Sequence, residues 1–224
     1  NALWYNFKSN EKEILYNKVE NIIKDFIIFK PINKNQLKIC VDLWCTNKED
    51  VLKRYGDISN WDTSLITDMS ELFYEKENFN DNINNWNTSK VTNMKGMFCN
   101  ALKFDQPLNS WDVSNVTDMS EMFFMATSFN QPLNSWDVSS VNDMHWMFNM
   151  AEDFNQPLNS WDVSSVRNMK EMFDSAIDFN QPLNSWNVSN VTNMESMFGG
   201  TEEFNQPLNS WDVSSVTGMS DMFN

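Results

Sequence analysis

The sequence predicts an α/β repeat fold, a solenoid of 25-residue strand-turn-helix coils with an α-helical N-terminal cap. Three observations predict it: tryptophan recurs every 25 residues, the apolar positions within a unit follow strand and then helix spacing, and the first 60 residues lack the repeat. The recurring residues are Trp61, Trp86, Trp111, Trp136, Trp161, Trp186 and Trp211. A spacing held without insertions indicates stacked coils.

The predicted division of the 224-residue chain follows from this spacing. Residues 1–60 form the cap, and residues 61–224 hold six full repeats and part of a seventh. The first repeat is degenerate, because residues 79–83 replace the Phe-Asn-Gln-Pro-Leu of later units, as is typical where an array meets a cap. The last unit stops in mid-repeat at Asn224, which predicts that the natural chain continues.

The N-terminal region predicts helices. Three segments carry apolar side chains close to helical spacing, namely residues 11–29, 35–44 and 49–55. Pro31 and Gly56 act as boundary signals for the two shorter segments. Because an open solenoid end exposes apolar surface, we expect this region to cover the first repeat. The side chains expected to pack toward it are Leu43, Trp44, Leu52 and Tyr55. The alternative is an independent helical module that recruits another molecule.

Each unit predicts a strand, a helix and two turns, as the unit from Trp136 illustrates. Leu133, Trp136 and Val138 alternate as in a short strand with buried side chains. Two turns of helix with one buried face are predicted by the i, i+3, i+4, i+7 spacing of Met144, Met147, Phe148 and Ala151. The following Phe-Asn-Gln-Pro returns the chain, because proline fixes φ and removes a donor.

The tryptophans are predicted to be the spine of the array. Each indole has roughly 150–250 Å² to bury, which at about 25 cal/mol per Å² gives an upper bound of roughly 4–6 kcal/mol. A ligand platform would leave much of this surface exposed. The methionines at helical spacing likewise indicate core packing.

The unit from Trp111, WDVSNVTDMSEMFFMATSFNQPLNS, closely resembles the mycoplasma-type repeats of BspA-like leucine-rich-repeat surface proteins. The resemblance covers residues 61–224, and its L-x-x-W-x-V part looks like a leucine-rich repeat with Trp in a Leu place. It implies a right-handed, leucine-rich-repeat-like solenoid in a cell-surface or secreted protein that mediates adhesion or partner binding. It implies no catalytic residues.

Charge is distributed unevenly along the chain, whose formal net charge is −15. Residues 1–60 hold ten Lys and Arg against eight Asp and Glu, whereas residues 61–224 hold six against 23. So acidic a repeat region repels phosphate backbones, which disfavours nucleic-acid binding. A basic partner or a divalent cation is better tolerated.

Cysteine and hydropathy patterns set further bounds. Cys40, Cys45 and Cys99 are an odd set without framework spacing, so they indicate buried or free thiols. No apolar run reaches 18 residues, which predicts no transmembrane helix. No leader is visible, but the sequence starts without Met and so leaves the compartment open, the cytoplasm included.

The residue that follows each tryptophan predicts an acidic column on a concave face. Its carboxylates are Asp62, Asp112, Asp137, Asp162 and Asp212. Strands about 4.8 Å apart would bring like charges close enough to repel by about 1 kcal/mol in water. Two interpretations stay open: each Asp caps a turn through the next Ser or amide, or the column binds a basic partner or a weak cation such as Ca²⁺ at Asp112, Asp137 and Asp162.

Other candidates are weaker. His145 and Trp146 break the pattern of their unit and are either incidental or a contact site. Asn155, Gln156 and Asn159 predict polar ladders whose amides bond the backbone of the next coil; the alternative is a carbohydrate-binding role. Positions 142, 145 and 149 and their equivalents 167, 170 and 174 vary between repeats, which predicts solvent exposure.

The sequence therefore favours a binding protein over an enzyme. A single histidine, no Gly-rich phosphate loop and polar groups copied in every unit disfavour an active site, and no cofactor is expected. We expect an interaction scaffold for a protein or glycan partner; the competing hypothesis is a structural spacer without a ligand. An ice- or mineral-binding face is disfavoured, because Asn142 and Arg167 interrupt the threonine column. The ligand and the oligomeric state stay open.

Overall fold

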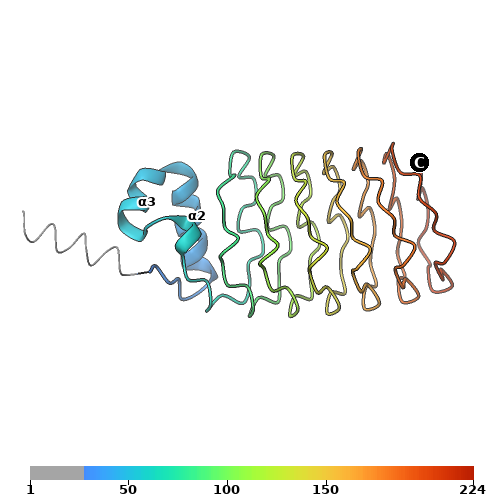
Figure 1. Cartoon of the computed structure of the whole chain (residues 1–224), viewed down its shortest axis with the longest axis horizontal. Helices are drawn as coiled ribbons and strands as arrows, with labels where there is room; N and C mark the ends of the chain where they lie inside the picture. Colours follow the sequence, from blue (N-terminus) through green and yellow to red (C-terminus); the bar gives the residue numbers. More distant parts are fainter. Residues whose placement is uncertain (1–27) are drawn as a thin grey trace, which may run out of the picture.

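A computed structural model describes residues 28–224 (Figure 1). Two helices, α2 (Lys34–Thr46) and α3 (Lys48–Tyr55), and a short 3₁₀ helix, η1 (Ile58–Asn60), precede the repeats. The repeats then stack one upon another along a single axis (Figure 1). We number the coils by their tryptophans, from coil 1 at Trp61 to coil 7 at Trp211. Most of the helix predicted over residues 11–29 lies outside the described residues.

The two shorter helix predictions are confirmed. The side chain of Asn33 accepts a hydrogen bond from the N–H of Gln36 and so caps the start of α2. Helix α3 ends at Gly56, whose φ of 73° lies in the left-handed region that glycine adopts without strain. The buried side of α2 consists of Leu37, Cys40, Val41 and Trp44.

Both helices are close to coil 1. The rings of Trp44 and Phe29 meet the ring of Trp61 edge-on, with centroid distances of 5.9 and 5.1 Å. Trp61 is only 2% exposed. Trp44 and the half-buried Tyr55 pack as predicted. The prediction for Leu43 and Leu52 is wrong, because both lie off the buried side of their helices and are 44% and 47% exposed.

The predicted α/β solenoid of strand-turn-helix coils is wrong. In residues 61–224 the structure contains neither a helix nor a strand of more than one residue. The coils are built from turns, and each adjacent pair shares one isolated parallel β-bridge. These bridges are Asp68–Asn93, Asn93–Asp118, Asp118–Asp143, Asp143–Asn168, Asn168–Asn193 and Asn193–Gly218.

The helix prediction fails because a chain of turns buries the same positions as a helix. Met144, Met147, Phe148 and Ala151 are all fully buried. Their N–H groups do not follow the helical ladder, however. In residues 144–151 the even-numbered N–H groups bond the next coil, as in Trp146 N–H to Lys170 O at 3.0 Å, and the odd-numbered ones close turns, as in Asn149 N–H to Trp146 O at 3.2 Å. Half of the backbone bonding is therefore between coils.

This arrangement requires left-handed backbone at two positions of the coil, four residues apart. Trp146 has φ 59° and Met150 has φ 56°, and the other coils repeat the pattern with Gly96 and Gly200 among the occupants. A non-glycine residue in this region costs of order 1–3 kcal/mol. The bonds between coils offset this cost in the stack.

The strand prediction is right about burial and wrong about backbone. Leu133, Trp136 and Val138 are buried, with at most 3% of their surface exposed. Their segment consists of turns, since Trp136 N–H bonds Leu133 O and Val141 N–H bonds Val138 O. The alternating pattern therefore predicted correctly which side chains are buried, although the backbone is not a strand.

The core consists of aromatic columns that run through the stack. Trp136 lies nearly parallel to Trp111 and Trp161, with ring centroids 6.5 Å apart on both sides. Two phenylalanine columns run beside them, with Phe148 and Phe154 4.1 Å apart within coil 4. The indole N–H of each tryptophan in this column, from Trp86 to Trp211, donates to a carbonyl 28 residues earlier at 2.8–3.1 Å. The prediction that the tryptophans form the spine is confirmed.

An amide ladder, formed by asparagine and glutamine side chains, links adjacent coils at the Asn-Gln-Pro-Leu segment. Asn155 Oδ1 accepts from Asn180 N–H at 3.0 Å and from Gln181 Nε2 at 2.8 Å in the next coil. Asp105 takes the same role toward coil 3. The prediction is confirmed for Asn155, whose side chain bonds the backbone of the next coil. It is wrong in detail for Gln156, which donates to the Asn130 side chain of the preceding coil at 2.9 Å, and for Asn159, whose backbone carbonyl accepts from Ser185 Oγ.

Candidate functional site

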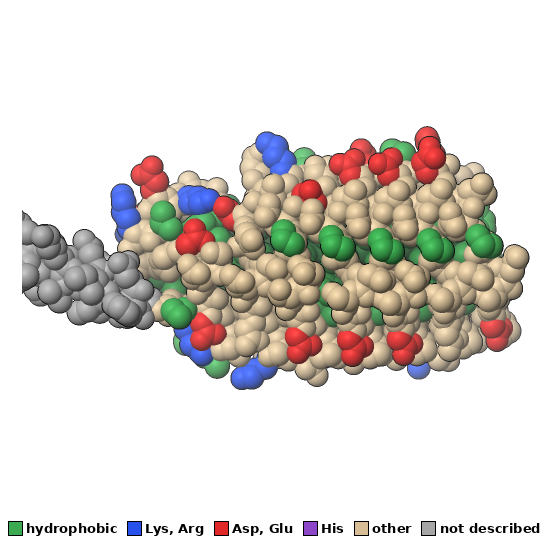
Figure 2. Space-filling model, viewed as in Figure 1, with side chains coloured by type: hydrophobic (Ala, Val, Ile, Leu, Met, Phe, Trp, Pro, Cys, Tyr) green, Lys and Arg blue, Asp and Glu red, His purple; other side chains and the backbone are tan. Residues whose placement is uncertain are grey.

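The predicted acidic column runs along the stack as exposed turn residues. The side chains of Asp112, Asp137, Asp162 and Asp212 are exposed, and Figure 2 shows acidic groups recurring along the stack. Each carboxylate accepts from the N–H of the Ser two residues later, at 3.0–3.1 Å. The interpretation that these residues cap turns is confirmed.

The hydrogen bonds favour the ionised form of Asp112, Asp162 and Asp212. Donation from Ser114, Ser164 and Ser214 lowers the pKa of Asp112, Asp162 and Asp212, respectively. Asp62 differs because Lys30 reaches it at 2.7 Å from the N-terminal region. Lys30 and then Ser64 lower the pKa of Asp62 to about 2. The column is therefore negatively charged at neutral pH.

The possible cation site at Asp112, Asp137 and Asp162 has no cluster to support it. Across residues 28–224, no three His, Cys, Asp or Glu side chains gather in a way that could hold a metal ion. Each of these carboxylates directs one oxygen to its own turn.

The imidazole of His145 contacts one carboxylate in its own coil and lies near another in the preceding coil. Its Nδ1 lies 2.7 Å from Asp143 Oδ1, and its Nε2 lies 3.5 Å from Glu121 Oε1. The hydrogen bond with Asp143 raises the pKa of His145 against the opposing effect of burial. Burial pushes the pKa of Asp143 upward, but bonds from the side chain and backbone of His145 outweigh it and the pKa is lowered.

Trp146, the second predicted contact residue, is only half-buried. Its ring stacks on Phe124 of coil 3 with a centroid distance of 5.5 Å. Its Nε1 is buried and has no hydrogen-bond partner within the described part of the chain, and the same is true of Asn149 Oδ1 three residues later. The structure thus brings His145 and Trp146 together with Phe124 and Asn149.

These residues belong to a surface that we call the variable face. It consists of the positions equivalent to His145, Trp146, Asn149 and Met150 in every coil. The residues between them, such as Met147 and Phe148, are fully buried, whereas most residues at the four positions are partly or fully exposed. The buried exceptions are Gly96, Cys99, Ser120, Asn149 and Gly199. From coil 1 onward they are Ser70, Glu71, Tyr74, Glu75; Lys95, Gly96, Cys99, Asn100; Ser120, Glu121, Phe124, Met125; His145, Trp146, Asn149, Met150; Lys170, Glu171, Asp174, Ser175; Glu195, Ser196, Gly199, Gly200; and Ser220, Asp221, Asn224.

Side chains of the variable face lie against their neighbours in adjacent coils. Lys95 pairs with Glu121 at 3.0 Å, and Lys170 pairs with Glu195 at 3.0 Å. The prediction of exposure holds for Asn142 and Arg167 but is wrong for Asn149, which is 3% exposed; His145, Lys170 and Asp174 are intermediate. Sequence reasoning noted variation at three of these positions but missed that it converges on one surface.

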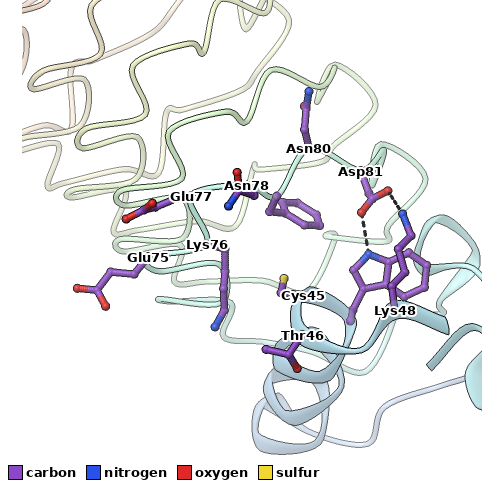
Figure 3. Close-up of a pocket in the computed structure, with 11 residues that line it drawn as sticks. Cys45, Thr46, Lys48, Glu75, Lys76, Glu77, Asn78, Asn80 and Asp81 are labelled. Carbon is purple, nitrogen blue, oxygen red and sulfur yellow. Dashed lines mark hydrogen bonds and ion pairs between the residues drawn. The ribbon is translucent and has the colours of Figure 1, made fainter. Parts of the chain in front are cut away.

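A pocket of about 680 Å³ lies between the α2–α3 junction and residues 75–81 of coil 1 (Figure 3). At its rim Asp81 accepts from Trp44 Nε1 at 2.8 Å and from Lys48 Nζ at 2.5 Å. Lys76 is paired with Asp42 at 2.7 Å. The pocket exists because coil 1 faces helices at this corner instead of another coil. Its lysines are occupied in joining the two regions.

The pocket also contains a thiol that is not activated. Burial raises the pKa of Cys45 to about 11, and burial raises that of Cys99 on the variable face to about 12. Both thiols are therefore protonated at neutral pH and are poor nucleophiles. All three cysteines are free, as the sequence predicted.

A stack of turn-built 25-residue coils with one irregular surface defines a repeat protein. Residues 45–156 and 131–224 match the family described as Mycoplasma protein of unknown function, DUF285, and together these matches span residues 45–224. The chain belongs to this family. Comparisons with curated proteins and with solved structures found no match. In the part of the chain that the structure describes, neither helix has the length and apolar character to cross a bilayer.

Proposed function

We propose that this chain is a non-enzymatic scaffold that binds a protein or glycan partner through its variable face. The observation that carries the proposal is the segregation of sequence variation. The Trp, Met, Phe and Asn-Gln-Pro-Leu positions are nearly constant from coil 3 to coil 6. The variable face ranges over the same coils from Gly199 to Trp146 and includes both signs of charge.

Stacking alone does not account for this difference. The constant positions bond or pack against the same position in the next coil, so each addition of a coil satisfies them again. A spacer that only sets length would be served by identical coils. Differences in size and charge that gather on one surface are typical of a binding surface in which each coil contributes a distinct contact.

The setting is part of the same proposal. The resemblance of the repeat to BspA-like surface proteins supports a place at the cell surface or outside the cell and a role in adhesion. The absence of a distinctive catalytic constellation in the sequence supports a non-enzymatic role, because the chain's only histidine is engaged by Asp143.

The second candidate surface is the acidic column. Its carboxylates are exposed and ionised, which suits a basic partner. We rank it below the variable face because each carboxylate already has a structural role in its own turn.

Peptide and glycan arrays probed with the full chain and two variants test the proposal. The first variant gives coil 4 the variable face of coil 5, through His145→Lys, Trp146→Glu, Asn149→Asp and Met150→Ser. The second carries Asp112→Asn, Asp137→Asn and Asp162→Asn, because coils 2 and 6 already have Asn at this position. Both variants use residues that neighbouring coils accommodate.

We expect a ligand whose affinity falls about tenfold or more in the first variant and less than about twofold in the second. The reverse result would move the binding site to the acidic column. If no ligand on either array depends on either surface, the scaffold proposal is wrong and the spacer hypothesis is favoured.

A further inference from the structure

We infer that the variable face of coils 3 to 5 binds an arginine-containing basic segment of a partner protein, with Trp146, Asn149 and Asp174 as its main contacts. This inference rests on the proposed scaffold function and names the site and the partner chemistry.

The first support is a pair of buried polar atoms that the fold does not satisfy. Within residues 28–224, Trp146 Nε1 is a donor without an acceptor, and Asn149 Oδ1 is an acceptor without a donor. A buried polar atom that lacks a partner costs about 1–3 kcal/mol. Stacking does not require either group, because the same positions in coil 3 are Glu121 and Phe124. A ligand that offers one donor and one acceptor would recover both costs.

The second support is a local apolar patch. Phe124 stacks on Trp146, Met125 is half-buried, and Met150 is 41% exposed. In coil 5 the positions of Phe124 and Met125 are Asp174 and Ser175, and in coil 6 they are Gly199 and Gly200. The patch of coils 3 and 4 therefore does not continue into coils 5 and 6. The two unbranched methionines can rotate at low cost, which allows a ligand to reach polar atoms that are covered in the free chain.

The third support is uncompensated negative charge beside the patch. Asn149 Nδ2 donates to Glu171 Oε2 at 3.2 Å, which places the amide next to one carboxylate of coil 5. Asp174 occupies the Asn149 position of that coil and forms no ion pair within residues 28–224. Burial, despite a bond from Ser175, raises the pKa of Asp174, and nearby Glu171 adds to the effect. Glu171 already lies 3.5 Å from Lys170 Nζ, so Asp174 is the carboxylate that a bound cation would compensate.

The backbone of coil 6 lies close against the Asp174 carboxylate, which occupies the space that a side chain at Gly199 would need. A Cβ at Gly199 would lie 2.8 Å from Asp174 Oδ2, closer than a side chain could approach. Gly200 next to it also lacks a side chain. The surface therefore falls from the large side chains of coil 4 to none at these positions of coil 6, with Asp174 between them.

The charge of the whole face selects among ligand classes. It carries seven carboxylates, Glu71, Glu75, Glu121, Glu171, Asp174, Glu195 and Asp221, against two lysines, Lys95 and Lys170. Both lysines are paired with glutamates. Anionic ligands are therefore repelled, and a neutral glycan would leave the carboxylates uncompensated.

A guanidinium satisfies these groups together. Its planar fork of donors can bond Asn149 Oδ1 and a carboxylate at once, and its face can stack on an aromatic ring. A backbone carbonyl of the same peptide can accept from Trp146 Nε1, and a neighbouring apolar side chain can cover Met150. Lysine offers the charge without the fork, so it should bind less tightly.

The test uses the full chain and labelled synthetic peptides that alternate Leu with Arg, Lys, Gln or Glu, titrated by fluorescence anisotropy. Asp174→Asn and Trp146→Glu are the site variants, since Asn149 and Glu121 show that neighbouring coils accept these residues. Asp137→Asn in the acidic column is the matched control, because it removes the same charge elsewhere. Unfolding curves for each variant confirm that the fold is retained.

We expect the affinity of the peptides to fall in the order Arg, Lys, Gln, Glu. The affinity for the Arg peptide should fall about tenfold in each site variant and less than about twofold in the control. Equal losses in Asp174→Asn and Asp137→Asn would overturn the inference, because the attraction would then be nonspecific. If a glycan from the arrays depends on Trp146 while no basic peptide does, the inference fails and the scaffold proposal stands. If nothing depends on the variable face, both fail.

Discussion

Trp136 and Trp146 lie ten residues apart in the same coil and have opposite relations to the fold. Trp136 is 3% exposed, stacks on an indole from each neighbouring coil, and donates Nε1 to Leu108 O at 3.1 Å. Trp146 is half-buried, stacks on Phe124, and has an Nε1 without a partner in the described part of the chain. Stacking therefore satisfies the hydrogen-bonding groups at the constant positions, whereas it leaves polar atoms on the variable face without partners in the described part of the chain.

The largest expected effect separates these two tryptophans by stability. Trp136→Ala should destabilise the chain by about 3–5 kcal/mol, because it opens a cavity in the column and leaves Leu108 O unpaired. Trp146→Ala should cost no more than about half as much, since its ring is partly exposed and its N–H makes no bond. Urea unfolding followed by circular dichroism measures both. Equal losses would show that the variable face is as structural as the core.

The second effect concerns the amide ladder. Asn155→Leu should destabilise the chain by about 1–3 kcal/mol, because the N–H of Asn180 and the amide of Gln181 lose their acceptor. Asn155→Asp keeps an acceptor and should stay within about 1 kcal/mol of the wild type, as Asp105 already does the same work in coil 2. Similar losses in both variants would mean that side-chain packing, not the hydrogen bond, matters here.

The helices α2 and α3 could be predicted from the sequence, but for the coils the prediction was right only about burial and stacking. Spacing identified the buried side chains of coil 4, from Leu133 to Ala151, and their register between coils. It could not identify the backbone, because turns with left-handed residues at Trp146 and Met150 bury the same positions as a helix. The bonds that decide between the two run between coils, and no single unit of sequence encodes them visibly.

The candidate site divides in the same way. The carboxylates of the acidic column were found from the sequence, because repetition shows a column directly. The surface around Trp146 was found only in part, because its contacts with Phe124 and Glu171 join residues of three coils. Unpaired atoms such as Asn149 Oδ1 leave no signal in a sequence at all.

The third effect tests the strained backbone of the variable face. Ser196 has φ 48°, and the equivalent residue of coil 2 is Gly96 with φ 57°. Ser196→Gly should change stability by up to about 1 kcal/mol in the favourable direction, because relief of strain exceeds the entropy lost on fixing glycine. Ser196→Ala keeps the Cβ and should bring no gain. Thermal unfolding of the two variants compares them, and a loss of stability in the glycine variant would contradict the strain.

The smallest effect is a pH dependence at His145. Because Asp143 raises its pKa, the protonated ring stabilises the folded chain at pH values below about 6.5, the ordinary pKa of histidine, and this contribution is lost as the pH rises through the raised value. His145→Ser removes the charge but keeps a donor to Asp143, as Ser120 donates to Asp118 at 2.7 Å in coil 3. The free energy of unfolding of the wild type should therefore exceed that of the variant by at most about 1 kcal/mol at pH 5, and this difference should shrink by pH 9. Urea titrations measure this stability difference. If it grows with pH, the interaction of protonated His145 with Asp143 is contradicted, and burial of the neutral ring dominates.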